Sequence, residues 1–131
     1  MNPDDFLYEY AVVRYVPRVD REEFVNIGMI MMCKRRRWLK GKLKFNEARL
    51  EAFDPYLNME SIFRQASIFT RKDVPAADIP IEEKYRWLTA VKSSILQVSP
   101  SHPGYLPHCS YEEPLSVLEA EFNRLFKSLV E

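Results

Sequence analysis

The sequence has few of the residues on which metal sites, disulfide frameworks and phosphate-binding loops depend. Its 131 residues include two cysteines, two histidines and three glycines. Cys33 and Cys109 form no CxxC pair, which favours reduced thiols in the cytoplasm over a disulfide framework. The three glycines are too scattered to form a phosphate-binding loop. We therefore predict a protein without a cofactor.

Long hydrophobic runs are also missing. No apolar segment reaches the length of a membrane span, and Asp4 and Asp5 spoil the basic start of a signal peptide. The apolar fraction of 47% and the charged fraction of 29% are ordinary for a folded protein. We predict one cytoplasmic domain over residues 1–131, with no membrane association.

The residues that could carry catalysis or hold a metal are poorly arranged. The spacing of His102, His108 and Cys109 matches no zinc pattern with two close pairs. Cys109 adjoins His108, but sequence neighbours in a loop rarely converge as nucleophile and base. Glu22 and Glu23 are adjacent on a polar link and should point to different faces, so they make a poor hydrolytic pair. We predict no metal site and no catalytic residue, with an enzyme of unrecognised type as the remaining alternative.

Charge is distributed unevenly along the chain. The 19 basic and 19 acidic residues cancel, yet the segment 34–44 holds seven cations and no acid. These cations are Lys34, Arg35, Arg36, Arg37, Lys40, Lys42 and Lys44. The rest of the chain therefore holds 12 basic against 19 acidic residues, and the neutral total conceals a dipolar protein.

Three strands are predicted in the first third of the chain. Residues 6–16 are rich in aromatic and β-branched side chains on both faces, and Pro17 ends the run. Residues 24–33 form an apolar run, and residues 38–45 alternate between apolar and charged side chains. Short polar connections predict antiparallel neighbours. In the third strand, Lys40, Lys42 and Lys44 form a ladder on the face predicted to be wet, with Trp38 at its start.

Asn26 and Gly28 interrupt the apolar run of the second strand. A glycine within a strand is typical of a bulge or of a close approach by another backbone. A buried amide needs hydrogen-bond partners. The first interpretation is a bulge held by the Asn26 side chain, and the alternative is a ligand approaching the sheet at Gly28.

Helices are predicted in the rest of the chain. Asn46 and Asn58 are suited to cap two short helices, and Asp54-Pro55 ends the first. A third helix is expected over residues 81–92, a strand-like run over 95–98, and an amphipathic helix over 114–130. The last of these has an apolar stripe: Leu115, Leu118, Phe122, Leu125, Phe126 and Leu129.

These elements predict an α+β fold. We expect an antiparallel sheet of three to four strands with helices packed on one face, where the C-terminal amphipathic helix closes the core.

The basic segment is the candidate binding surface. Its predicted members are Arg14, Arg35, Arg36, Arg37, Trp38, Lys40, Lys42 and Lys44. Arginine suits carboxylate and phosphate, so an acidic protein partner is one interpretation. Nucleic-acid binding, with Trp38 stacking on a base, is a second. In a third, the lysines only protect an exposed edge strand from pairing with other chains.

Three segments carry a family resemblance: YEYAVVRYVPRVDREEFVNIGMIMMC, YRWLTAVKSSILQVSPSHPGY and the closing LFKSLV. Together they resemble a bacterial family catalogued as domain of unknown function 3037. Members often have proline where this chain has Lys34, and Pro-Arg where it has Val91-Lys92. The basic turn is therefore expected to be peculiar to this protein.

The resemblance assigns no activity. It implies a partner, because members are often encoded beside a toxin-like serine/threonine kinase. We therefore predict a non-enzymatic interaction or accessory module whose basic face meets an acidic protein partner, with such a kinase as the partner that the resemblance implies. Nucleic acid is the alternative partner, and the oligomeric state is not predicted.

Overall fold

A computed structural model describes residues 6–17, 21–71, 78–90, 95–106 and 114–131. Five strands form one antiparallel sheet, so the expected three to four strands were too few. The strands are β1 (Leu7–Tyr15), β2 (Val25–Cys33), β3 (Trp38–Leu43), β4 (Leu96–Val98) and β5 (His102–Tyr105). The helices are α1 (Glu47–Phe53), α2 (Met59–Ala66), α3 (Ile81–Thr89) and α4 (Pro114–Leu129), with a 3-10 turn η3 (Ser67–Phe69) after α2.

The sheet is built outward from β1. The strand order is β3-β2-β1-β4, and β5 also pairs with β1. β1 and β2 pair from Glu9 opposite Met32 to Tyr15 opposite Val25, and β3 continues from β2 through the turn 34–37. The first three predicted strands are confirmed, because their apolar content and short connections are local signals.

β4 and β5 follow one another along the same edge of β1. Ser99 fixes the break between them: its N–H donates to the Val12 carbonyl at 2.9 Å, and its Oγ accepts the Val12 N–H at 2.9 Å. The predicted strand over 95–98 is confirmed as β4. β5 was missed because Pro103 and Gly104 indicate a turn, although proline is tolerated on an edge strand.

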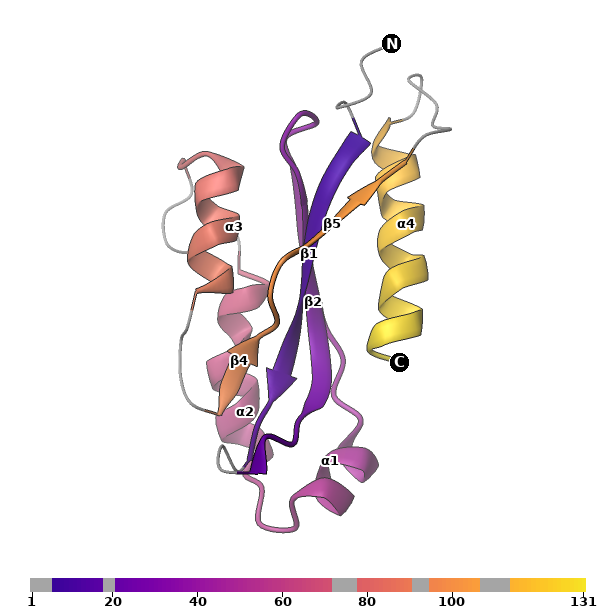
Figure 1. Cartoon of the computed structure of the whole chain (residues 1–131). Coiled ribbons are helices and arrows are strands. Elements are labelled where there is room, and N and C mark those ends of the chain that lie inside the picture. Colours follow the sequence, from indigo (N-terminus) through magenta and orange to yellow (C-terminus); the bar gives the residue numbers. More distant parts are fainter. Residues whose placement is uncertain (1–5, 18–20, 72–77, 91–94, 107–113) are drawn as a thin grey trace.

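Helices cover both faces of the sheet, so the prediction of helices on one face was wrong. Figure 1 shows α2 and α3 on one side of the twisted sheet and α4 on the other. One core joins the sheet to α1, α2 and α3, with buried residues that include Ile27, Ile30, Met32, Leu50, Ile62, Tyr85 and Leu88. The other joins it to α4, with Tyr8, Met29, Met31, Cys33, Trp38, Leu118, Phe122, Leu125 and Phe126. The physical reason lies in β1 and β2, which carry apolar side chains on both faces.

The predicted bulge in β2 is confirmed. Val13 pairs with Gly28 and Arg14 with Asn26, so Ile27 is the extra residue. A Cβ on Gly28 would lie 2.8 Å from the Lys42 carbonyl oxygen. The backbone of β3 therefore occupies the space next to Gly28 in which the alternative interpretation placed a ligand. The Asn26 side chain holds the bulge to α4 by donating to the Leu129 carbonyl at 2.9 Å.

The predicted helix caps are also confirmed. The side chain of Asn46 accepts the Arg49 N–H at 3.0 Å, and that of Asn58 accepts the Ser61 N–H at 3.1 Å. α3 begins at Ile81 as expected. In α4 most of the predicted stripe is buried, but Leu115 is 53% exposed because it lies near the start of the helix, beyond the second core.

Candidate functional site

The Lys ladder lies beside α4, with Lys40 partly buried and Lys42 and Lys44 exposed. The Lys40 Nζ pairs with the Glu119 carboxylate and lies 4.9 Å from the ring centroid of Phe122. The Lys42 Nζ lies 4.7 Å from the ring centroid of Phe126. In these contacts the aliphatic stems and the ammonium groups of Lys40 and Lys42 pack against the C-terminal helix.

Trp38 shares a face of β3 with Lys40 and Lys42, as the alternation predicts, but this face is buried at Trp38 and exposed only at Lys42. The indole is 8% exposed and packs edge-on against Phe122, with ring centroids 6.2 Å apart. The position assigned to Trp38 was therefore wrong, because α4 covers the part of this face that holds the indole. In this arrangement the indole is not placed to stack on a base.

β3 is an edge strand, as the edge-protection interpretation requires. Gly41 lies so close to the 3-10 turn that an added Cβ would be 2.1 Å from the Phe69 carbonyl oxygen. The turn therefore packs on the face of β3 opposite α4, because a Cβ in a strand points to a face of the sheet, and Gly41 is needed for the approach.

The turn 34–37 divides its cations. The Arg37 N–H donates to the Lys34 carbonyl at 3.1 Å, and Arg37 adopts a left-handed φ of 49°. The Arg36 guanidinium is half-buried, 4.7 Å from the ring centroid of Phe6, whereas Lys34, Arg35 and Arg37 are exposed. Arg36 therefore packs on the core, and the other three cations present positive charge at the tip of the hairpin.

Arg14 is not brought to this turn. It lies opposite Asn26, near the far end of β2, and its guanidinium carbon is 4.1 Å from the ring centroid of Phe24. The eight residues predicted to form one binding surface therefore separate into four groups: the residues of β3 beside α4, the exposed arginines of the hairpin tip, Arg36 on Phe6 and Arg14 on Phe24.

A hollow of about 340 Å³ opens beside the hairpin tip, and we call it the turn hollow. It is lined by Leu7, Tyr8, Glu9, Met32, Lys34, Arg35 and Pro103. Leu7 is 45% exposed, and its partner across the β1–β5 ladder, Tyr105, is 47% exposed. The hollow is therefore an apolar surface with basic residues at one end.

Leu7, Glu9 and Pro103 were missed as site residues by sequence reasoning. β5 brings Pro103 opposite Glu9, and the proline and glycine in β5 conceal that pairing. The signal in the sequence was the basic turn itself: Arg35 of the predicted set lines the hollow, together with Lys34, which was not in that set.

A hydrogen-bonded chain connects Tyr85 to Glu9, which lines the turn hollow. Ser101 Oγ donates to Glu9 Oε1 at 3.1 Å and lies 2.7 Å from the Tyr85 hydroxyl oxygen. The single proton of Ser101 goes to Glu9, so Tyr85 donates to Ser101. Burial raises the pKa of Tyr85 to about 12, and the nearby Glu9 charge acts in the same direction, so Tyr85 keeps its proton at neutral pH.

A second polar cluster stabilises α4. The Tyr8 hydroxyl donates to Glu121 Oε2 at 2.5 Å, and Arg124 Nε donates to Glu121 Oε1 at 2.6 Å. The hydrogen bond from Arg124, aided by that from Tyr8, lowers the pKa of Glu121 although burial opposes the shift. Gly104 makes room for this arrangement, because its added Cβ would lie 2.1 Å from the Tyr8 ring.

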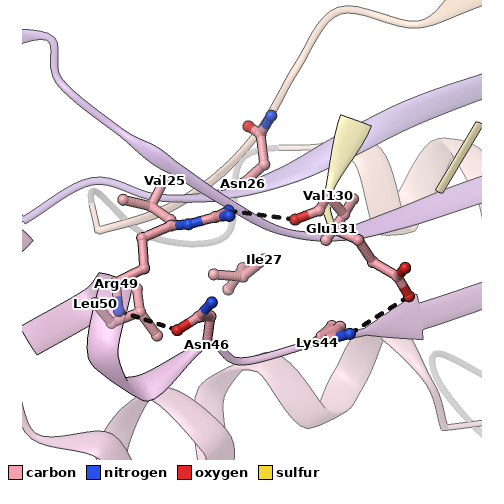
Figure 2. A pocket seen from close by; sticks show the side chains of 9 residues that line it. All are labelled: Val25, Asn26, Ile27, Lys44, Asn46, Arg49, Leu50, Val130 and Glu131. Atoms are coloured by element: carbon pink, nitrogen blue, oxygen red, sulfur yellow. Dashed lines mark hydrogen bonds and ion pairs between the residues drawn. The ribbon is translucent and has the colours of Figure 1, made fainter. Parts of the chain in front are cut away.

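A smaller cavity of about 150 Å³ lies at the end of α4. Figure 2 shows Arg49 and Lys44 converging on Val130 and Glu131: Arg49 donates to the Val130 carbonyl at 3.4 Å, and Lys44 Nζ is 3.5 Å from Glu131 Oε1. Cations near the C-terminus of a helix are favourable because they oppose its dipole. The cavity is therefore part of the structure that anchors α4.

The described ranges contain only part of the candidate metal and thiol residues. No group of three or more His, Cys, Asp or Glu side chains that could hold a metal ion occurs there. Cys33 is fully buried in β2, whereas His108 and Cys109 lie outside the described residues. Within those same ranges, no helix combines the length and hydropathy that crossing a membrane requires.

Comparison with known proteins gives one match. A family model described as "Protein of unknown function (DUF3037)" matches residues 10–130. No curated protein and no solved structure matches the chain. The matched range runs from within β1 to the residue after α4 and so includes the bulge, the first core and all of the second core except Phe6 and Tyr8. The chain therefore belongs to the DUF3037 family, as the resemblance of its strand and loop segments predicted.

Proposed function

We propose that this protein is an interaction module that binds an acidic segment of a protein partner at the turn hollow. The observation that carries the proposal is the combination of an apolar floor, formed by exposed Leu7 and Pro103 with buried Met32 beside them, with Lys34 and Arg35 at one end. Binding energy in protein interfaces is concentrated in a few anchor side chains that fill such hollows. One large apolar side chain of the partner would fill this one.

The charge of the rim selects an acidic segment. Lys34 is exposed, and the sequence around it contains seven cations and no acid between residues 34 and 44. Complementary charge accelerates association and excludes wrong partners. A carboxylate next to the apolar anchor would therefore meet Lys34, where Arg35 adds positive charge to the rim.

The surroundings of the hollow suit a polypeptide. Exposed apolar surface continues from Leu7 to Tyr105 on the neighbouring strand. An extended segment can lie across both strands, whereas a small ligand would leave Tyr105 uncovered. A serine/threonine kinase, the partner that the family resemblance implies, would have to present such a segment at its surface.

A selection from displayed random peptides tests this proposal. We expect enrichment of sequences with Asp or Glu beside one large apolar residue, and an affinity that falls as salt rises. Leu7→Asp should abolish binding, because it places a charge on the apolar floor. Lys34→Glu should weaken binding several-fold, mainly through slower association.

Lys127→Glu is the matched control, because Lys127 is an exposed lysine on the last turn of α4 and does not line the hollow. It should leave binding unchanged. Peptides selected without an acidic residue, or binding that survives Leu7→Asp, would refute the proposal. Micromolar retention of single-stranded oligonucleotides at physiological salt, lost in Lys34→Glu, would support nucleic-acid binding instead.

A further inference from the structure

The turn hollow contains a negative group as well as the positive ones. Glu9 lines it, between Met32 on one neighbouring strand and Pro103 on the other. Leu7 is two residues away on the same face of β1, at a distance of about 7 Å along the strand. The carboxylate therefore lies in the same cross-strand row as Met32 and Pro103, within the apolar floor, and Lys34 and Arg35 complete the lining with positive charge.

Glu9 is held in place by a hydrogen bond from Ser101. Ser101 donates to its Oε1, and Ser101 in turn accepts from Tyr85, which is 2% exposed and fixed in α3. Among the described residues no other hydrogen bond reaches this carboxylate. An ionised carboxylate can accept about four hydrogen bonds, so Glu9 keeps most of its capacity for a ligand.

We propose that Glu9 binds a Lys or Arg side chain of the same partner segment. The inference rests on the proposed function and extends it. The hollow would then recognise an apolar anchor with an acidic residue on one side and a basic residue on the other. A charge-assisted hydrogen bond to a carboxylate fixed in advance is stronger than one between neutral groups. The uncharged side chains of Ser101 and Tyr85 orient Glu9 and leave its charge unneutralised.

This arrangement also gives discrimination between partners. A segment with acidic residues on both sides of the anchor would place a carboxylate against Glu9, and such like-charge contacts exclude wrong ligands. The hollow is thus selective for the order of charges, and Ser101 acts as a positioning residue.

Two fluorescent peptides test the inference by polarisation. Both are acetylated and amidated, so that charge comes from side chains alone, and both carry a leucine next to a glutamate. One has lysine on the other side of the leucine and the other has glutamine. Wild-type protein should bind the lysine peptide about tenfold more tightly, the size expected for one charge-assisted hydrogen bond.

Glu9→Gln should remove this preference and leave the affinity for the glutamine peptide unchanged, because the amide keeps the size of the side chain and an acceptor for Ser101. Ser101→Ala should reduce the ratio of the two affinities without changing the glutamine-peptide affinity, an effect that lost stability would not produce. Glu83→Gln is the matched control, since Glu83 is an exposed acid in the first turn of α3. It should keep the full preference.

The outcomes separate this inference from the proposed function. Equal affinity of the wild type for both peptides, or an equal loss for both in Glu9→Gln, overturns the role of Glu9. The proposed function survives that result if the glutamine peptide still binds and Lys34→Glu still weakens it. If neither peptide binds at millimolar concentration, the proposed function and the role of Glu9 both fail.

Discussion

Replacing Phe122 by alanine should lower the free energy of unfolding by about 3–5 kcal/mol, the range found for truncation of buried aromatic residues. The ring is fully buried in α4. It packs edge-on against Trp38 at 6.2 Å and stacks on Phe126 at 5.9 Å, and Lys40 Nζ lies 4.9 Å from its centroid. The substitution therefore opens a cavity where the helix, the edge strand and a lysine of the ladder meet. Since domains of this kind are stable by roughly 5–15 kcal/mol, the loss is a large share of the total.

Urea denaturation followed by circular dichroism measures this loss, and tryptophan fluorescence reports on the site itself. Trp38 is the more buried of the two tryptophans, since Trp87 is 37% exposed. Its emission should shift to the red when the Phe122 ring is removed. Leu115→Ala is the matched control in the same helix, because Leu115 is 53% exposed, and it should change stability by less than about 0.5 kcal/mol.

A loss below about 1 kcal/mol in Phe122→Ala, with unchanged tryptophan emission, would refute the reasoning. It would mean that α4 does not close the second face of the sheet. The ladder lysines would then be free for the binding role that their alternation first indicated.

Three further predictions concern backbone fit and titration. Gly41→Ala should destabilise the protein by about 1–3 kcal/mol, because its Cβ would lie 2.1 Å from the Phe69 carbonyl oxygen; an unchanged melting temperature would contradict this. Arg37→Gly should stabilise it by about 0.5–1 kcal/mol in thermal melts by relieving the left-handed φ of 49°, and a lower melting temperature would argue against strain there. Arg124 is the main cause of the lowered pKa of Glu121. The ionised Glu121 carboxylate therefore stabilises the fold fully above its pKa in the unfolded chain, about 4.3, and this stabilisation is lost as the pH falls through the lower pKa in the folded protein. Urea melts from pH 6 to pH 3 should therefore show a shallower acid loss in Glu121→Gln, and identical pH profiles would exclude this role.

Local patterns in the sequence determined most of the fold. The caps at Asn46 and Asn58, the bulge at Gly28 and the first three strands all follow from residues close to one another in the chain. Alternation in β3 also correctly separated two faces. It could not show that α4 covers part of the charged face, because lysine stems pack against apolar surface while their charges reach its edge.

The candidate site was predictable only in part. The segment 34–44 was identified by its charge, but proximity in sequence grouped cations that the strand and the turn then separate. Lys34 and Arg35 reach the turn hollow, whereas Arg36 packs on Phe6. The apolar floor and Glu9 depend on the pairing of β5 with β1, a contact between segments more than 90 residues apart that composition does not encode.

The position of α4 after every element that it covers has a consequence for synthesis on the ribosome. The face of β2 and β3 that carries Met29, Met31 and Trp38 is complete about 70 residues before α4 begins. At a synthesis rate of about 5–20 residues per second, roughly 3–15 s pass between the synthesis of this face and the synthesis of α4. During that interval Lys40 and Lys42 lie on an otherwise apolar edge strand, where charge opposes pairing with other nascent chains. The residues that later seat α4 thus protect the unfinished protein, and we expect chains released before residue 114 to aggregate faster when both lysines are replaced by threonine.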